Sequence, residues 1–193
     1  MSKTLKQLRK ERKERKVGTA ITADKHYTEA QMTTILDSLE SVRRKRADMY
    51  FYIMICVYTG ARRTEAALIE TKDVTKTGVT IRSLKKSRDR DIPLPPDFHA
   101  ELTEYSKDKD YLFDFCPDVA ARWMRKVIPP RLEIKRPLHA LRHTIAVKIY
   151  RETKDIKFLQ KFLGHRWISS TSVYLDAVEI EDYDLSNVWS KAS

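Results

Sequence analysis

Hydrophobic residues recur at helical spacing through most of the chain. Thr28 and Gln31 form a capping-box pattern ahead of the first such series, which predicts a helix over TEAQMTTILDSL. Residues 46–60, RADMYFYIMICVYTG, are apolar nearly all round, so we expect a buried helix that Gly60 ends. A third, short helix is expected over TEAALIE (64–70). The same spacing predicts helices at residues 97–107, 117–127, 138–151, 155–163 and 169–178.

One stretch follows a different period. Around the charged segment LKKSRDRD (84–91), apolar and polar residues alternate, and the apolar positions are Val79, Ile81, Ile92 and Leu94. Alternation of this kind predicts a small β-hairpin or meander with a basic tip, and the prolines that follow end it. The fold class that we expect is therefore mainly α with a small antiparallel β-sheet (α+β).

Positive charge is in excess and is concentrated at the N-terminus. The 193 residues, enough for one domain with a real core, carry a formal net charge of +11. Residues 1–16 alone hold 8 basic and 2 acidic residues, which is typical of a solvated arm that orders on nucleic acid. An excess of this size suggests a polyanionic partner. Because many basic proteins bind no nucleic acid, charge alone leaves both alternatives open.

Other features bear on the cellular compartment. No apolar run follows the basic arm as a signal peptide would require, and no apolar stretch reaches the length of a membrane span. Cys56 lies in an apolar run, and Cys116 lies far from it in the sequence. We interpret both as buried thiols and not as a disulfide framework, which indicates a reducing cytoplasm.

Three separated segments carry residues suited to phosphoryl chemistry. They are TGARRTEAAL (59–68), the basic hairpin around Lys85, and HALRHT (139–144) followed by LGHRWISSTSVYL (163–175). Together they resemble the tyrosine recombinase (phage integrase) family. The pattern of that family is T-G-x-R-x-x-E, a hairpin lysine, H-x-x-R, then L-G-H and a tyrosine nine residues after that histidine. The resemblance covers about residues 26–178 and implies the catalytic-domain fold of the family.

The resemblance implies a catalytic set that consists of Arg62, Lys85, His139, Arg142, His165 and Tyr174. Attack on a phosphodiester develops negative charge on the non-bridging oxygens, and the guanidiniums of Arg62 and Arg142 suit those oxygens because they bind bidentately and stay charged. Tyr174 would be the nucleophile, leaving a 3′-phosphotyrosine and a free 5′-hydroxyl. This interpretation requires Arg62 and Arg142 to converge and the Tyr174 hydroxyl to be accessible; a hydroxyl buried in the interior would contradict it.

The other members of the set are implied to transfer protons. Lys85 matches the general acid that protonates the departing 5′-oxygen, and the adjacent Lys86 is the alternative because the usual glycines of this turn are absent. His139 and His165 would donate hydrogen bonds to the phosphate or move the phenolic proton. Because the covalent intermediate keeps the energy of the phosphodiester bond, we expect neither metal, ATP nor another cofactor.

Several neighbouring residues have less specific interpretations. His139 and His143 stand four apart on one helical face, which is half of a zinc site, but no third ligand is evident nearby. We therefore interpret His143 as a buried, hydrogen-bonded structural residue. Glu65 is expected to pair with a nearby arginine and Trp167 is expected to pack, whereas the sequence assigns no role to Arg63.

The resemblance divides the chain into a basic arm (1–25), a catalytic domain (26–180) and a C-terminal tail (181–193). Most relatives carry a separate core-binding domain ahead of the catalytic one. Here we expect a naturally minimal enzyme, similar in length to the short fimbrial phase-variation recombinases, or a fragment of a longer integrase, with the arm tracking the DNA backbone. Residues 175–186 hold five acids and no base, and the resemblance implies that they dock on a neighbouring subunit, with Trp189 as an anchor.

The function that the resemblance implies is site-specific recombination of double-stranded DNA. Dimers would pair into a tetramer and exchange strands through a Holliday junction, with accessory DNA-bending proteins as further partners. The alternatives are a non-catalytic DNA-binding protein of the same fold, a type IB topoisomerase that relaxes supercoils, and, more remotely, a metallohydrolase. The sequence does not name the target site or the direction of exchange.

Overall fold

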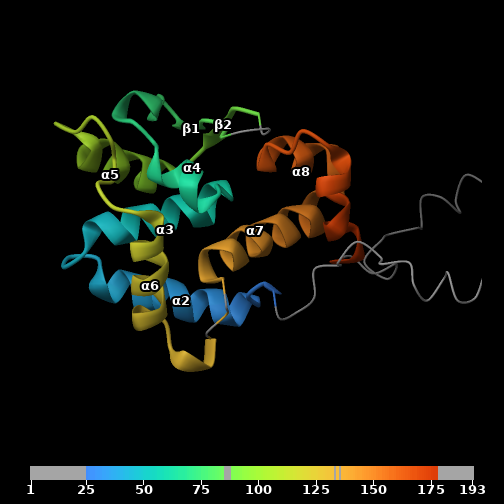
Figure 1. Cartoon of the computed structure of the whole chain (residues 1–193), viewed down its shortest axis with the longest axis horizontal. Helices are drawn as coiled ribbons and strands as arrows, with labels where there is room; N and C mark the ends of the chain where they lie inside the picture. The colour runs from blue at the N-terminus through green and yellow to red at the C-terminus, as the bar shows by residue number, and fades with distance from the viewer. Residues whose placement is uncertain (1–24, 85–87, 133, 135, 178–193) are drawn as a thin grey trace, which may run out of the picture.

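The computed structural model describes residues 25–84, 88–132, 134 and 136–177, and these ranges are mainly helical (Figure 1). Their α-helices are α2 (Glu29–Val42), α3 (Ala47–Thr59), α4 (Arg63–Ala67), α5 (Pro96–Ser106), α6 (Pro117–Val127), α7 (Pro137–Thr153) and α8 (Ile156–Leu163). Short 3₁₀ segments are η2 (Thr71–Asp73), η3 (Pro130–Leu132), η4 (Ile168–Ser170) and η5 (Ser172–Ala177). Nearly all of the predicted arm, the hairpin tip at Lys85 and the predicted tail lie outside the described residues.

A two-stranded antiparallel sheet lies between α4 and α5 in chain order. Strand β1 (Gly78–Ile81) pairs with β2 (Arg90–Pro93), with Val79 opposite Ile92. The apolar residues of both strands are buried, so the predicted alternation is confirmed. The predicted fold class, mainly α with a small antiparallel sheet, is therefore confirmed.

Helix α3 lies at the centre of the described residues. It contacts α2, α4, α6 and α7, and Figure 1 shows it between these helices. Every side chain from Met49 to Cys56 is buried, as the all-round apolar pattern predicts. Phe51 stacks on Tyr105 of α5 with ring centroids 4.5 Å apart, which ties α3 to the next layer. Gly60 follows the helix in the left-handed conformation, so the predicted stop is confirmed.

A smaller apolar cluster joins α7, α8 and η5, and its buried members are Ala146, Val147, Tyr150, Leu159, Leu163 and Tyr174. The α-helix predicted over residues 169–178 is wrong, because the chain forms η4 and η5 there instead. Hydroxyl side chains compete for backbone and ring partners in this segment: Ser172 donates to the carbonyl of Ser169, and Thr171 bonds the ring of His165. As a result, η5 packs the side chain of Tyr174 against the apolar side chains of α7 and α8.

Predictions for single residues have mixed outcomes. The capping box at Thr28 is confirmed, with both reciprocal hydrogen bonds present, and Cys56 is buried as predicted. Cys116 is exposed and not buried, because it lies in the turn that precedes α6. Trp167 is 62% exposed and not packed in the core; the guanidinium of Arg166 lies 5.3 Å from the centroid of its ring. No helix within the described ranges is both long enough and apolar enough to cross a membrane.

Candidate active site

Arg142 is the buried centre of the candidate site. It is 2% exposed, and it donates from Nη1 to the carbonyl oxygen of Gly60 and from Nη2 to that of Leu163 at 2.8 Å. These carbonyls lie at the C-terminal ends of α3 and α8, where backbone oxygens lack helical partners and the helix dipole is negative. One guanidinium therefore joins two helix ends to α7.

Glycines stand at both of these helix ends. Gly60 and Gly164 have φ angles of 58° and 66°, in the left-handed region that favours glycine. A Cβ on Gly164 would also lie 2.7 Å from Nη1 of Arg90 and 2.8 Å from the carbonyl oxygen of Arg88. The glycines of the T-G and L-G-H motifs therefore allow two helices to end against the same buried arginine, Arg142.

Glu65 is a buried carboxylate that binds two arginines. It accepts from the backbone N–H of Arg62 at 2.9 Å, from Nη1 of Arg62 at 2.8 Å and from Nη2 of Arg90 at 2.9 Å. Burial acts to raise the pKa of Glu65, but the charge of Arg90 and the donors of Arg62 outweigh burial and lower the pKa. The predicted pairing of Glu65 with an arginine is confirmed, and Arg90 joins the site as a residue that the sequence did not predict there.

A cationic cleft opens beside these residues. It has a volume of about 640 Å³ and lies between α4, α6 and the start of α7. The basic residues that line it are Arg62, Arg63, Arg122, Arg125, Arg136, His139 and Arg142. Among the described residues that line it, the one acidic side chain is that of Asp118, which forms an ion pair with Arg63 across α4 and α6. A cleft with this charge is suited to a phosphodiester.

Both ring nitrogens of His165 make hydrogen bonds. Its Nε2 is 2.9 Å from Nη2 of Arg142, and its Nδ1 is 2.9 Å from Oγ1 of Thr171. A guanidinium can only donate, so Nε2 accepts and the ring proton lies on Nδ1. Burial, together with the charges of Arg142 and Arg62, lowers the pKa of His165 to about 3, so the ring is neutral. Donation from Nε2 to a phosphate therefore requires this contact to rearrange.

Tyr174 is buried beside the cleft and does not line it. The residue is 2% exposed, and its hydroxyl lies 2.8 Å from Nδ1 of His143. Burial raises the pKa of Tyr174, although the charges of Arg142 and Arg62 act in the opposite direction. The expectation of an accessible hydroxyl is wrong for this conformation, because η5 packs the phenol into the cluster of α7 and α8. The field of the two arginines nevertheless reaches the phenol.

His143 is the main residue whose position sequence reasoning missed. It is hydrogen-bonded, as predicted, but it is half-buried and not fully buried, and its partner is the proposed nucleophile itself. Its ring also packs edge-on against His139, with centroids 4.3 Å apart and an interplanar angle of 77°. A signal was present in the sequence, since His143 lies on the same face of α7 as His139 and directly follows Arg142.

The structure thus brings together four residues of the predicted set: Arg62, His139, Arg142 and His165. Tyr174 is adjacent, and Lys85, like its alternative Lys86, lies outside the described residues. The chain near this hairpin is anchored beside the site, because the N–H of Arg88 donates to the carbonyl of Gly164 at 3.1 Å. Within the described ranges, no three His, Cys, Asp or Glu side chains are grouped as a metal ion would need.

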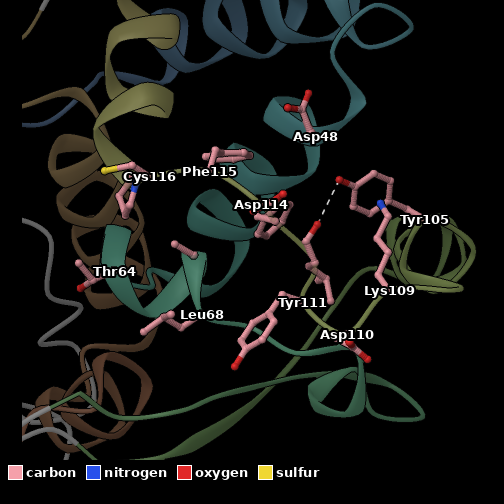
Figure 2. A pocket seen from close by; sticks show the side chains of 14 residues that line it. Asp48, Thr64, Leu68, Tyr105, Lys109, Asp110, Tyr111, Asp114, Phe115 and Cys116 are labelled. Atoms are coloured by element: carbon pink, nitrogen blue, oxygen red, sulfur yellow. Dashed lines mark hydrogen bonds between the residues drawn. The ribbon is translucent and has the colours of Figure 1, made fainter.

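A second hollow, of about 990 Å³, lies between the start of α3, α4 and the connection from α5 to α6. Figure 2 shows Leu68 and Tyr111 at this hollow, with Asp110 and Asp114 nearby. The dashed line there is the hydrogen bond from the Tyr105 hydroxyl to the carbonyl of Leu112, at 3.2 Å. None of the described members of the predicted catalytic set lines this hollow, so we assign the chemistry to the cationic cleft.

Comparisons with known proteins identify relatives of this chain. The profile of the phage integrase family matches residues 25–179. A tyrosine recombinase of Thermosipho africanus (strain TCF52B) is 27% identical over 172 residues, which cover 81% of this chain and 59% of the relative. The integrase of Escherichia phage P2 is 29% identical over 149 residues, covering 77% of this chain and 42% of the relative. The chain thus spans about half the length of these curated relatives.

Solved structures share the fold. The catalytic domain of bacteriophage HP1 integrase matches with a TM-score of 0.64 at 23% identity, over 87% of this chain and 98% of that domain. The XerH site-specific recombinase, bound to its difH substrate in a pre-cleavage complex, matches with a TM-score of 0.64 at 23% identity, over 88% of this chain and 54% of that protein. Since the family profile covers most of its length, the chain belongs to the phage integrase family.

Proposed function

We propose that this chain is the catalytic part of a site-specific DNA recombinase, which cleaves and religates double-stranded DNA through a 3′-phosphotyrosine at Tyr174, without metal or ATP. The observation that carries the proposal is the convergence of Arg62, His139 and Arg142 on one cationic cleft, beside the buried Tyr174. The names of the relatives support it, since they are tyrosine recombinases and integrases.

The cleft supplies the electrostatic part of the mechanism. A phosphodiester between Arg62 and Arg142 would receive donors where negative charge develops during attack, and loss of one such donor costs on the order of a hundredfold in rate. Burial, followed by the charges of Arg62 and Arg90, lowers the pKa of Arg142 to about 9, which leaves the guanidinium protonated at neutral pH. His165 would turn from Arg142 toward the phosphate as the DNA enters.

The phenol of Tyr174 has to leave its buried seat before it attacks. Extracting a buried aromatic side chain costs about 1.5–3 kcal/mol, and the lost hydrogen bond adds about 1 kcal/mol. Contacts with DNA and with neighbouring subunits would offset this cost. In the chemical step the phenol of Tyr174 gives its proton to His139 or His165 as its oxygen forms a bond to phosphorus. The bond from phosphorus to the 5′-oxygen breaks, and Lys85 or Lys86 protonates the departing oxygen.

Assembly on DNA belongs to the same proposal. Dimers would pair into a tetramer and exchange strands through a Holliday junction, with accessory DNA-bending proteins as further partners. The basic arm, residues 1–25, would follow the DNA backbone, because its positive charge is suited to phosphate contacts. The acidic segment 175–186 would dock on a neighbouring subunit with Trp189 as its anchor, since acidic side chains do not suit a DNA surface.

Covalent trapping on a suicide substrate tests the proposal. A nick near the scissile phosphate lets the 5′-hydroxyl fragment diffuse away, so the protein remains attached to DNA after denaturation. We expect the adduct to map to the peptide of Tyr174, to persist in the presence of a chelator and to disappear in Tyr174→Phe. The matched control is Tyr183→Phe, which should still form it. An adduct on another residue, or one that survives Tyr174→Phe, would refute the proposal.

A further inference from the structure

The hydrogen bond between His143 and Tyr174 has a consequence for when the nucleophile becomes available. We propose that His143 is a positioning residue that holds Tyr174 in its buried seat, and that the phenol reaches the cleft only after this bond breaks. The inference rests on the proposed function, because it assumes that Tyr174 is the nucleophile. Under this proposal His143 controls when the nucleophile becomes available, in addition to its structural contacts.

The buried position of Tyr174 explains why one hydrogen-bond acceptor matters for keeping its hydroxyl buried. The phenol ring is buried among apolar side chains that include Val147, Leu159 and Leu163, and its hydroxyl lies 2.8 Å from Nδ1 of His143. A buried hydroxyl without a partner is strongly disfavoured relative to one that is hydrogen-bonded. The acceptor on His143 therefore makes burial of the whole tyrosine favourable.

The two groups differ too much in acidity for His143 to act as the base in this conformation. Burial, followed by the charges of His139 and Arg142, lowers the pKa of His143 to about 4, so its ring is neutral. The pKa of Tyr174 is raised above its ordinary value of 10.0, so the phenol is the donor. Transfer of the proton to His143 is therefore strongly disfavoured, whereas a neutral hydrogen bond is stable. His143 thus holds the phenol and does not deprotonate it.

His139 connects the hydrogen bond between His143 and Tyr174 to the cleft. This histidine lines the cleft, and its ring packs edge-on against that of His143 with centroids 4.3 Å apart. A phosphate that bonds His139 would act directly on the ring that holds Tyr174. Occupation of the cleft and release of the nucleophile are therefore linked through two adjacent turns of α7.

Nitration of tyrosines in the DNA-free protein measures the release. Tetranitromethane modifies solvent-accessible phenols, and peptide mapping resolves the nine tyrosines of the chain. In the wild type we expect Tyr174 to react far more slowly than the half-exposed Tyr111. In His143→Phe the hydroxyl loses its acceptor, so the Tyr174 nitration rate should rise about tenfold or more. Equal rates in wild type and His143→Phe would overturn the proposal.

Matched variants separate release from unfolding. His143→Asn keeps an acceptor near the position of Nδ1 and should hold the nitration rate of Tyr174 within about threefold of the wild type. Tyr52, fully buried in the other core, is the internal reference for global opening. A rise at Tyr174 with Tyr52 unchanged supports the proposal. Should the phenylalanine variant fail to fold, His143→Ala is measured in the same way, and a parallel rise at both tyrosines overturns the proposal.

The covalent adduct supplies a second readout. With Tyr174 released, His143→Phe should form the adduct on the suicide substrate at least as fast as the wild type. A hundredfold slower attachment with Tyr174 exposed would show that His143 takes the proton, and would overturn its assignment as a holding group. If the wild type forms no adduct while the nitration pattern is as expected, the proposed function fails and the contact itself stands.

Discussion

Loss of the charge on Glu65 should destabilise the protein more than any surface substitution near the cleft. In Glu65→Gln the side chain of Arg90, 5% exposed, keeps a charge that no longer has a carboxylate opposite. Removing one partner of a buried ion pair costs about 3–5 kcal/mol, and glutamine retains part of the hydrogen bonding, so we expect about 3 kcal/mol. For a chain of 193 residues this corresponds to a fall in Tm of about 6–12 °C.

Urea unfolding followed by circular dichroism measures this change. The control is Asp118→Asn, which breaks the exposed ion pair with Arg63 and should cost less than about 1 kcal/mol. The double variant Glu65→Gln with Arg90→Met should recover much of the loss, because no uncompensated charge remains buried. A loss in Glu65→Gln no larger than that in Asp118→Asn would refute the reasoning.

Because Glu65 is ionised in the folded protein, we also expect the free energy of unfolding to depend on pH. The folded pKa of Glu65 is below its unfolded value, which is near 4.5, because Arg90 and Arg62 outweigh the effect of burial. The stability that Glu65 contributes is therefore fully present above about pH 4.5 and is lost as the pH falls through the lower, folded pKa. Unfolding free energies measured from pH 7 to pH 3 should fall more steeply for the wild type than for Glu65→Gln below this point; parallel curves would contradict the prediction.

Three further predictions follow from the site and its surroundings. Gly164→Ala should cost about 2 kcal/mol or more in urea unfolding, because its Cβ would lie 2.7 Å from Arg90 at a positive φ; a loss below about 0.5 kcal/mol would contradict the contact. Asp118→Asn should tighten DNA binding several-fold at low salt, since it releases Arg63 and removes the acid from the cleft lining; unchanged affinity in a titration would exclude this role. Deletion of residues 1–16 should flatten the salt dependence of DNA binding, and an unchanged slope would exclude arm contacts.

Local patterns made much of the fold predictable. The capping box at Thr28, the all-round apolar helix and the alternation around β1 and β2 each act over a few residues, and each is confirmed. The helix predicted over 169–178 failed because hydroxyl side chains there find partners outside an α-helix, including the ring of His165. Spacing alone does not show such competition. Prediction of local structure was therefore most reliable where side chains offered the backbone no alternative hydrogen-bond partner.

The candidate site was predictable in its membership and less so in its arrangement. The motif order placed Arg62, His139, Arg142 and His165 together, and the structure brings them together. The burial of Tyr174 depends on how η5 packs on α7 and α8, which is a tertiary property. Sequence spacing identified the phenol but not its partner.

The carbonyl anchors of Arg142 also bear on when the proposed strand-breaking chemistry could first appear. They come from residues 82 positions before it and 21 positions after it, so the anion-binding geometry exists only once the chain has closed two loops of very different length. A nascent chain released early, or a proteolytic piece that ends ahead of α8, would have the guanidinium and the carbonyl of Gly60 but not the carbonyl of Leu163. Such molecules would lack a fully anchored Arg142 and, under the proposed function, could not cleave DNA.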